Sequence, residues 1–301
     1  MRRLGLIGAG VVGTAIGLIL AAKGHEITGV FDVNPESTSF LSERTGAPVF
    51  SSPEAVARSC EILFITTHDS AIEKVAGQIA ATDGFTAGQI VAHMSGALTS
   101  DVLSAARNAG CFVVSIHPMQ SFANAERAIA NLPGSVFSIE GDAETRETAA
   151  ELVTDLGGEY FYIAKEAKPL YHAGACVVSN YLVTLIDVGL QILESCGIPR
   201  GKALKAFIPL IEGTISNIER IGIPKALTGP IARGDHVTVQ DHLRCLEELA
   251  PQIVRLYSML GYYTADVANA KGTIDREAAE RFQTLFLNGM ARKKRARAGG
   301  E

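Results

Sequence analysis

The feature that most constrains this chain is a glycine pattern near its N-terminus. The apolar run from Arg3 to Ile7 opens directly into Gly8-Ala9-Gly10-Val11-Val12-Gly13, which has the spacing G-x-G-x-x-G. This pattern predicts a strand, a tight turn and a helix, in which Gly8 allows the turn, Gly10 admits a pyrophosphate and Gly13 lets the helix pack on the strand. Free N–H groups and the helix dipole would favour phosphate there.

A second strand pattern follows at the distance that a dinucleotide site requires. It ends at Asp32, about 20 residues past the glycines, where an acid binds a ribose 2′-hydroxyl. A carboxylate repels a 2′-phosphate, so Asp32 favours NAD, with NADP as the alternative. Three residues that end a later buried strand are further candidates for binding the cofactor: Thr66, Thr67 and His68.

Strand patterns alternate with helical ones up to residue 164, and the pattern then changes. The alternation predicts an α/β fold with a doubly wound parallel sheet. After it we expect an all-α domain with helices over 169–195, 201–220, 238–260 and 275–291. The expected organisation is a Rossmann domain over 1–164, a helical substrate and dimerisation domain over 165–291, and a basic flexible tail over 292–301. The helix over 169–195 is apolar nearly all round, which indicates burial on more than one side and favours a homodimer.

Charge and cysteine content narrow the function classes. The net charge is -5, and five basic residues lie in the last ten positions, so the body is more acidic than the whole. An acidic body argues against nucleic acid as the main partner. The apolar run over 4–22 superficially resembles a membrane helix, but its five glycines favour the nucleotide fold. Five scattered cysteines without a Cys-x-x-Cys pair indicate neither zinc nor disulfides, and they fit the cytoplasm.

Three histidines, His68, His93 and His117, lie at strand ends, where ligands bind in open parallel sheets. Histidine exchanges protons near neutrality, so these are acid/base or substrate-binding candidates. The alternative is that strand ends are wet and tolerate any polar residue. Ser95, two residues after His93, is a candidate hydrogen-bond donor.

A second candidate cluster begins the long helix. Lys168, His172 and Ser179 form a polar stripe, and Asn180 borders it. Such a stripe binds either a substrate or a neighbouring helix. Arg233, in a glycine-bounded loop, could bind a carboxylate or pair with a nearby acid. Three residues that precede helical runs are expected to be helix caps: Asp69, Ser100 and Asp235.

Several motifs together resemble the Rossmann-like proteins that carry the domain of unknown function 2520. These are the glycine pattern, His93-Met94-Ser95-Gly96-Ala97-Leu98, His117-Pro118-Met119-Gln120, Tyr171-His172-Ala173-Gly174-Ala175, Ser179-Asn180-Tyr181, and Thr228-Gly229-Pro230 through Arg233-Gly234-Asp235. The resemblance implies a fold of the 6-phosphogluconate dehydrogenase-like group and an NAD(P)-dependent oxidoreductase activity. It also implies dimerisation through the helical domain.

Relatives in that group suggest roles for single residues. Hydroxyacid and ketopantoate enzymes use Lys-x-x-x-Asn on the first long helix, with lysine as the acid/base, and Lys168-x-x-x-His172 occupies the comparable place. The stretch His117-Pro118-Met119 resembles one in prephenate dehydrogenase, whose histidine polarises the substrate hydroxyl, and Ser95 lies near the place of an active-site serine there.

We therefore expect hydride transfer between a nicotinamide cofactor and a small hydroxy, oxo or imino compound, with a carboxylate, in the interdomain cleft. The expected catalytic residues are His117, His172, Ser95, Asn180 and Lys168, and the expected substrate-binding residues are His93 and Arg233. Two alternatives remain open: a dinucleotide-binding sensor without turnover, and a non-redox enzyme that binds the nucleotide structurally.

Overall fold

The computed structural model describes residues 1–291, and the basic tail predicted at 292–301 lies outside these residues. The chain divides into two compact units, Met1–Asn180 and Tyr181–Glu301. Strand patterns end near residue 164, but the first unit extends to Asn180, because Lys168 and His172 of the next helix contact groups on the sheet side.

The first unit is built on a seven-stranded sheet with the order β2-β1-β3-β4-β5-β6-β7. Each strand is short and mostly buried, apart from the exposed edge strand β7. The strands are β1 (Arg3–Ile7), β2 (Glu26–Phe31), β3 (Ile62–Ile65), β4 (Ile90–His93), β5 (Phe112–Pro118), β6 (Val136–Gly141) and β7 (Glu159–Tyr162).

The strand order shows which edge of the sheet is expected to bind the ligand. Strands β2 and β3 flank β1 on opposite sides, so the chain reverses direction across the sheet at the carboxyl ends of β1 and β3, where open sheets bind ligands. Strands β1 to β5 are parallel, as predicted. Strand β6, however, runs antiparallel to β5, with Ser115 opposite Glu140 and His117 opposite Ser138. The predicted doubly wound parallel sheet is confirmed, and this pairing is its one antiparallel exception among the described strands.

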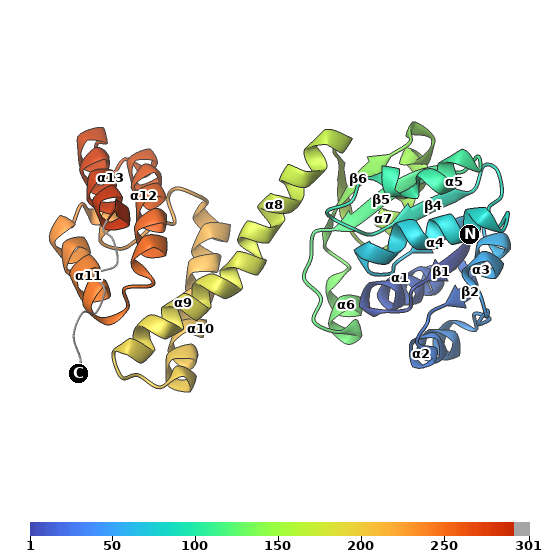
Figure 1. The fold of residues 1–301 in the computed structure, drawn as a ribbon, viewed down its shortest axis with the longest axis horizontal. Coiled ribbons are helices and arrows are strands. Elements are labelled where there is room, and N and C mark those ends of the chain that lie inside the picture. Colours follow the sequence, from blue (N-terminus) through green and yellow to red (C-terminus); the bar gives the residue numbers. More distant parts are fainter. Residues whose placement is uncertain (292–301) are drawn as a thin grey trace, which may run out of the picture. The chain divides into compact units, whose positions relative to one another are not determined.

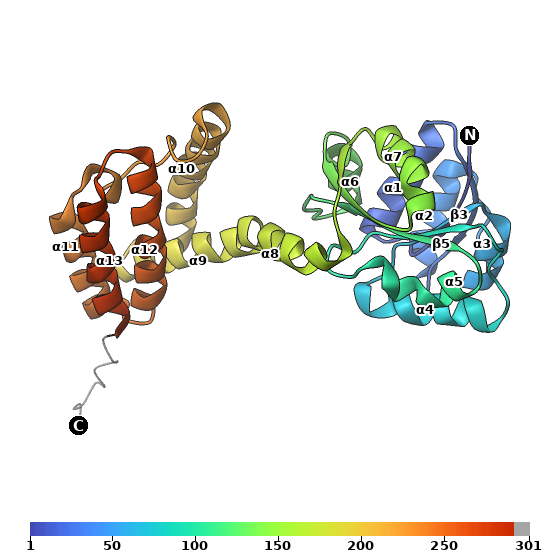
Figure 2. The same cartoon turned by 90° about the horizontal axis from the view of Figure 1, so that it is seen from above.

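Helices cover both faces of the sheet, as Figure 2 shows. One buried cluster joins Leu4, Leu6 and Phe64 to α1, α6 and α7, and the other joins Leu63 and Ile65 to α3, α4 and α5. Alternate residues of β3 thus enter opposite cores, as a strand buried on both faces requires. The helices of this layer structure are α1 (Val11–Ala22), α2 (Pro35–Thr45), α3 (Pro53–Ser59), α4 (Asp69–Ala81), α5 (Ser104–Asn108), α6 (Ala125–Asn131) and α7 (Arg146–Asp155).

Helices α3 and α6 were not predicted from the sequence. Both are short, but both carry start signals: Pro53 occupies the first turn of α3, and the Asn124 side chain accepts from the amide of Arg127 at the start of α6. Between α2 and α3, Val49 forms an isolated parallel bridge to Val30 of β2.

The second unit is helical (Figure 1), and its core joins α11, α12 and α13. The helix predicted over 169–195 is divided at Ser179 into two helices, and the one predicted over 238–260 is broken at Ala250, whose backbone leaves the helical region before Pro251. The helices from residue 168 onward are α8 (Lys168–Val178), α9 (Asn180–Ser195), α10 (Arg200–Ile221), α11 (His236–Leu249), α12 (Val254–Lys271) and α13 (Arg276–Ala291).

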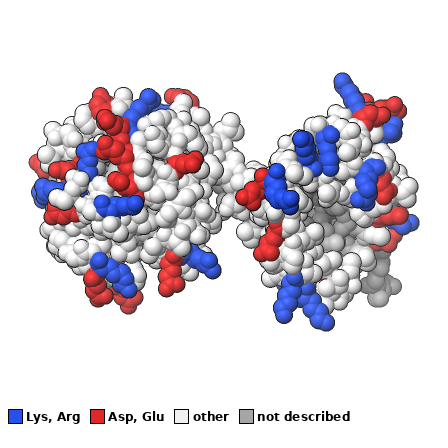
Figure 3. All heavy atoms as spheres, turned by 180° about the vertical axis from the view of Figure 1, so that it is seen from behind, with Lys and Arg blue, Asp and Glu red and all other residues white. Residues whose placement is uncertain are grey.

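The stretch Lys165–Ser195 is largely exposed and apolar. By length and composition it could cross a membrane, with a mean hydropathy of 1.7, although such a test also selects helices that pack against protein. Leu170, Val178 and Val183 are each more than two-thirds exposed. Figure 3 shows acidic and basic side chains interspersed on the visible face of the sheet unit.

Candidate functional site

The glycine turn after β1 has the geometry predicted from the sequence. Gly8 has a φ of +99°, and a Cβ on it would lie 2.8 Å from the Thr66 carbonyl carbon. A Cβ on Gly13 would lie 2.0 Å from the Gly8 carbonyl oxygen, whereas a Cβ on Gly10 would meet nothing within 4 Å. Protein atoms therefore pack closely against the turn at Gly8 and Gly13, whereas the space beside Gly10 is open.

The groups around this turn fit a dinucleotide. Helix α1 begins after Gly10 with no side-chain cap and no acidic residue in its first turn, so the N–H groups of Val11 and Val12 are available to phosphate oxygens. Asp32 Oδ2 accepts from the amide of Ala9 at 2.6 Å, which fixes the carboxylate at the end of β2. A carboxylate oxygen has a second lone pair, so the same group can also accept from a ribose hydroxyl.

The residues after β3 close one side of the turn. Thr66 Oγ1 donates to the Gly8 carbonyl at 2.6 Å, and Thr67 follows it half-buried. His68 is exposed at the start of α4 and makes no capping bond. Asp69 was expected to be a cap, but its Oδ2 accepts from Ser95 Oγ at 2.7 Å instead.

Two predicted residues after β4 are fully engaged within the protein. His93 has no exposed surface; its Nδ1 accepts from the Ser95 amide at 3.1 Å, and its Nε2 lies 3.2 Å from the Thr99 carbonyl. Burial lowers the pKa of His93 to about 3, so the ring is neutral. Ser95 Oγ donates to Asp69 and accepts from the amides of Ala97 and Leu98. Both side chains therefore shape the loop that contains Gly96.

His117 and His172 converge on that loop. A Cβ on Gly96 would lie 2.6 Å from His117 Nε2 and 2.7 Å from His172 Nδ1, and the two ring centroids are 6.1 Å apart. His172 Nδ1 is buried without a hydrogen-bond partner among the described residues, while its Nε2 lies 3.5 Å from Cys176 Sγ. These two imidazoles come from β5 and α8, which the sequence did not show to be neighbours.

His117 has a partner, Tyr171, that was not predicted as a site residue. Its Nδ1 lies 2.8 Å from the hydroxyl of Tyr171, on α8. Burial, together with the nearby Lys168 and His172, lowers the pKa of His117 to about 4, and burial raises the pKa of Tyr171. The pair is therefore an uncharged imidazole and a protonated phenol at neutral pH.

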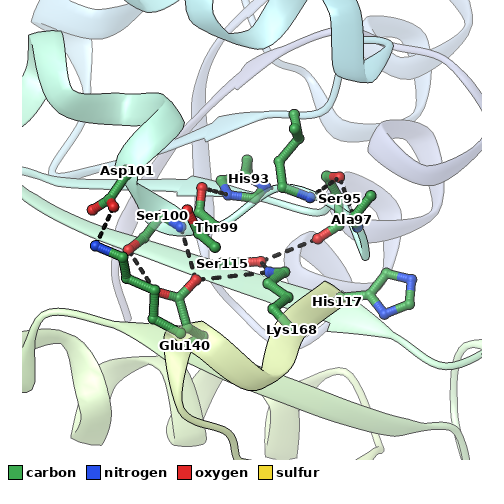
Figure 4. A network of polar contacts seen from close by, with 12 residues as sticks. His93, Ser95, Ala97, Thr99, Ser100, Asp101, Ser115, His117, Glu140 and Lys168 are labelled. Carbon is green, nitrogen blue, oxygen red and sulfur yellow. Dashed lines mark hydrogen bonds and ion pairs between the residues drawn. The ribbon is translucent and has the colours of Figure 1, made fainter. Parts of the chain in front are cut away.

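Lys168 lies beside Ser115 of β5, in a buried network shown in Figure 4. Its ammonium donates to Ser115 Oγ and lies 3.9 Å from Glu140 Oε2. Ser100, expected to be a cap, instead donates its amide and its hydroxyl to the Glu140 carboxylate, each at 2.7 Å. Neither Ser115 nor Glu140 was predicted; a buried acid on a strand is the one signal that could have indicated Glu140.

The remaining candidates are on α8, α9 and the second unit. Ser179 and Asn180 are exposed where α8 ends and α9 begins. Arg233 is exposed in the second unit, at the end of the short turn Ile231–Arg233. Asp235 caps α11 as predicted, since its side chain accepts from the Thr238 amide.

Comparison with known proteins agrees with this architecture. A Rossmann-like domain matches residues 1–118, and the domain of unknown function DUF2520 matches residues 135–264. The chain therefore carries a Rossmann-like domain followed by a DUF2520 domain. Among curated proteins, the comparison finds no match.

Solved structures share the fold of this DUF2520 protein. Protein TM1727 from Thermotoga maritima is 25% identical, with a TM-score of 0.70 over 89% of this chain and 99% of that one. An imine reductase from Myxococcus stipitatus, in complex with NAD+, is 20% identical, with a TM-score of 0.60 over 94% and 99%. A pyrroline carboxylate reductase from Plasmodium falciparum with NADP bound is 15% identical, with a TM-score of 0.56 over 95% and 98%.

Proposed function

We propose that this DUF2520 protein is an NAD(P)-dependent oxidoreductase that acts on a small hydroxy, oxo or imino compound. One observation carries the proposal: the open glycine turn after β1 and the imidazoles of His117 and His172 lie at the same carboxyl edge of one sheet. The fold shared with structures of NAD+- and NADP-bound reductases supports it. A sensor that only binds a dinucleotide would not require two imidazoles converging beside that site.

The cofactor would be held by the turn Gly8 to Gly13, the start of α1, and Asp32. When bound, it supplies or accepts the hydride. Asp32 favours NAD over NADP, since a fixed carboxylate repels a 2′-phosphate. Thr66, Thr67 and His68 complete this side of the proposed binding site.

His117 would handle the proton. A neutral imidazole has one donor and one acceptor nitrogen, and with Tyr171 donating to Nδ1, the proton lies on Nε2, toward Gly96. In the reduction direction, Nε2 gives that proton to the substrate oxygen or nitrogen, and Nδ1 takes the Tyr171 proton in exchange. Water then protonates Nε2 while Nδ1 returns its proton to the Tyr171 phenolate, so both residues regain their starting state.

His172 would orient the substrate. Its buried, unpartnered Nδ1 needs a hydrogen-bond partner, and a heteroatom beside Gly96 would provide it. We keep Asn180 as a candidate orienting donor and Arg233 as a candidate carboxylate-binding residue. His93 and Ser95, whose polar atoms are occupied, support the loop instead of binding the substrate.

A direct test measures cofactor binding and turnover separately. NADH and NADPH fluorescence titrations of the full chain report binding, and oxidation of each cofactor at 340 nm reports turnover with a panel of 2-oxo acids, ketones and cyclic imines. Turnover that His117→Ala abolishes while binding persists supports the proposal. Binding without turnover across the panel favours the sensor, and substrate conversion without net cofactor oxidation favours a non-redox enzyme.

We also propose that a second copy of this chain covers the exposed apolar side chains of α9. Large exposed apolar surface is uncommon on monomers, and a self-complementary face suits a two-fold dimer.

A further inference from the structure

Lys168 is placed where it cannot touch a substrate. It has no exposed surface, and its ammonium group donates to Ser115 Oγ, on β5. A buried ammonium requires a compensating negative charge, which Glu140 provides at 3.9 Å. The positive charge of Lys168 is thus compensated within the protein.

Glu140 is itself held firmly. Its Oε2 accepts from the Ser100 amide, and its Oε1 accepts from the Ser100 hydroxyl. On the antiparallel pair β5–β6, Glu140 lies directly opposite Ser115. One end of the Lys168 network is therefore anchored to the sheet.

The other end of the network reaches the loop between the histidines. Ser115 accepts from Lys168, so its own hydroxyl proton is free to donate to the Ser95 carbonyl, 3.2 Å away. That carbonyl belongs to the peptide that joins Ser95 to Gly96. Gly96 in turn lies against His117 Nε2 and His172 Nδ1, closely enough that a Cβ would collide with both.

We propose that Lys168 is a positioning residue: through Ser115 it holds the Ser95–Gly96 peptide against His117 and His172. This inference rests on the proposed function, in which those two histidines act. It replaces the acid/base role that the resemblance to hydroxyacid enzymes implies. Because Lys168, Tyr171 and His172 share helix α8, the same tether also fixes where that helix begins relative to β5.

The charged groups around Lys168 determine which pKa values should change when Lys168 is replaced. Burial lowers the pKa of Lys168 to about 8, opposed by Glu140 and Asp69, so the ammonium remains charged at neutral pH. Lys168 also faces His93 and lowers its pKa.

Around His117, Lys168 and His172 oppose a positive charge, Asp69 favours it, and Tyr171 contacts Nδ1.

Histidine NMR of the free full-length protein tests the tether without any substrate. The protein is labelled with ¹³C at the imidazole, and signals are assigned with single His→Gln variants. Three variants are compared: Lys168→Met removes the tether and its charge, Ser115→Ala removes only the hydroxyl link, and Lys165→Met is the matched control, since Lys165 is exposed and paired with Asp101. NADH fluorescence titration checks that each variant still binds cofactor.

We expect Lys168→Met to raise the titration midpoint of His117 by about one pH unit, because a nearby positive charge is lost. Both Lys168→Met and Ser115→Ala should shift the His172 signal, whereas Lys165→Met should shift neither histidine. If the His172 signal is unchanged in Ser115→Ala, the tether is wrong, even if Lys168→Met fails to fold. Because the readout is independent of turnover, an inactive wild-type protein would overturn the proposed function and leave this result standing.

Discussion

The hydroxyl of Tyr171 lies 2.8 Å from Nδ1 of His117, joining the first helix after the sheet to strand β5. The two rings meet edge to face, with centroids 5.7 Å apart, and the Phe161 ring also contacts Tyr171, with centroids 6.0 Å apart. This contact determines which imidazole nitrogen faces Gly96, since the nitrogen bonded to Tyr171 cannot also bind a substrate.

Tyr171→Phe removes this hydrogen bond and leaves the ring packing unchanged. If His117 transfers the proton and Tyr171 supplies a proton to its Nδ1, kcat should fall by about 100-fold, the size typical of a lost general acid/base contribution. Steady-state cofactor oxidation measures it. Tyr263→Phe, at an exposed tyrosine of the second unit, is the control and should keep the wild-type rate. A Tyr171→Phe rate equal to wild type would remove Tyr171 from the mechanism.

Stability should fall as the pH falls from about 6.5 toward 4. Burial lowers the pKa of His117 to about 4 and of His93 to about 3, so between these values and the ordinary 6.5 the unfolded chain binds more protons than the folded one. The free energy of unfolding therefore decreases with acidification in this window. Urea unfolding at pH 7 and pH 5 measures the difference. His117→Gln should reduce it, while His68→Gln, at an exposed site, should not.

The two glycines of the turn should respond differently to alanine. Gly13→Ala places a methyl 2.0 Å from a carbonyl oxygen and should destabilise the protein by about 2 kcal/mol or prevent folding. Gly10→Ala meets no protein atom, so its melting temperature should stay close to wild type while NADH binding weakens. Thermal melts and fluorescence titrations separate the two effects. Equal losses of stability would contradict the open geometry at Gly10.

Asp32→Ala should change cofactor preference. The variant loses the carboxylate that repels a 2′-phosphate and accepts a ribose hydroxyl, so the Kd for NADH should rise about tenfold, with a smaller change for NADPH. Titration with both cofactors measures the ratio. Glu43→Gln, an exposed acid on α2, controls for general charge loss. A ratio unchanged in Asp32→Ala would show that another residue selects the cofactor.

Val183→Asp should dissociate the proposed dimer, because it puts a charge on the apolar face of α9. Sedimentation velocity of the wild-type chain should give about twice the mass of one 31.8 kDa chain, and the variant should sediment as a single chain. Val237→Asp, equally exposed on α11, should remain dimeric. A monomeric wild type across micromolar concentrations would contradict the dimer.

Local sequence signals predicted the parts of this fold whose cause is local. The G-x-G-x-x-G spacing, the apolar strand runs and the cap at Asp235 depend on residues within a few positions of each other, and the structure has them as predicted. The break before Pro251 was missed although its signal is local, because the helical pattern on both sides outweighed one proline.

For the candidate site, the sequence predicted some of the residues but not the contacts between them. The sequence by itself determined the glycine turn, Asp32 and the identity of His117 and His172 as polar residues at a strand end and a helix start. Only the tertiary structure decided their partners: Asp69 binds Ser95, Glu140 faces Lys168, and Gly96 lies between the two imidazoles. These contacts join residues more than 20 positions apart in the chain. They depend on the register of β5 with β6 and on where α8 begins, and both are set by packing of the whole unit. No periodic pattern in the sequence indicates them.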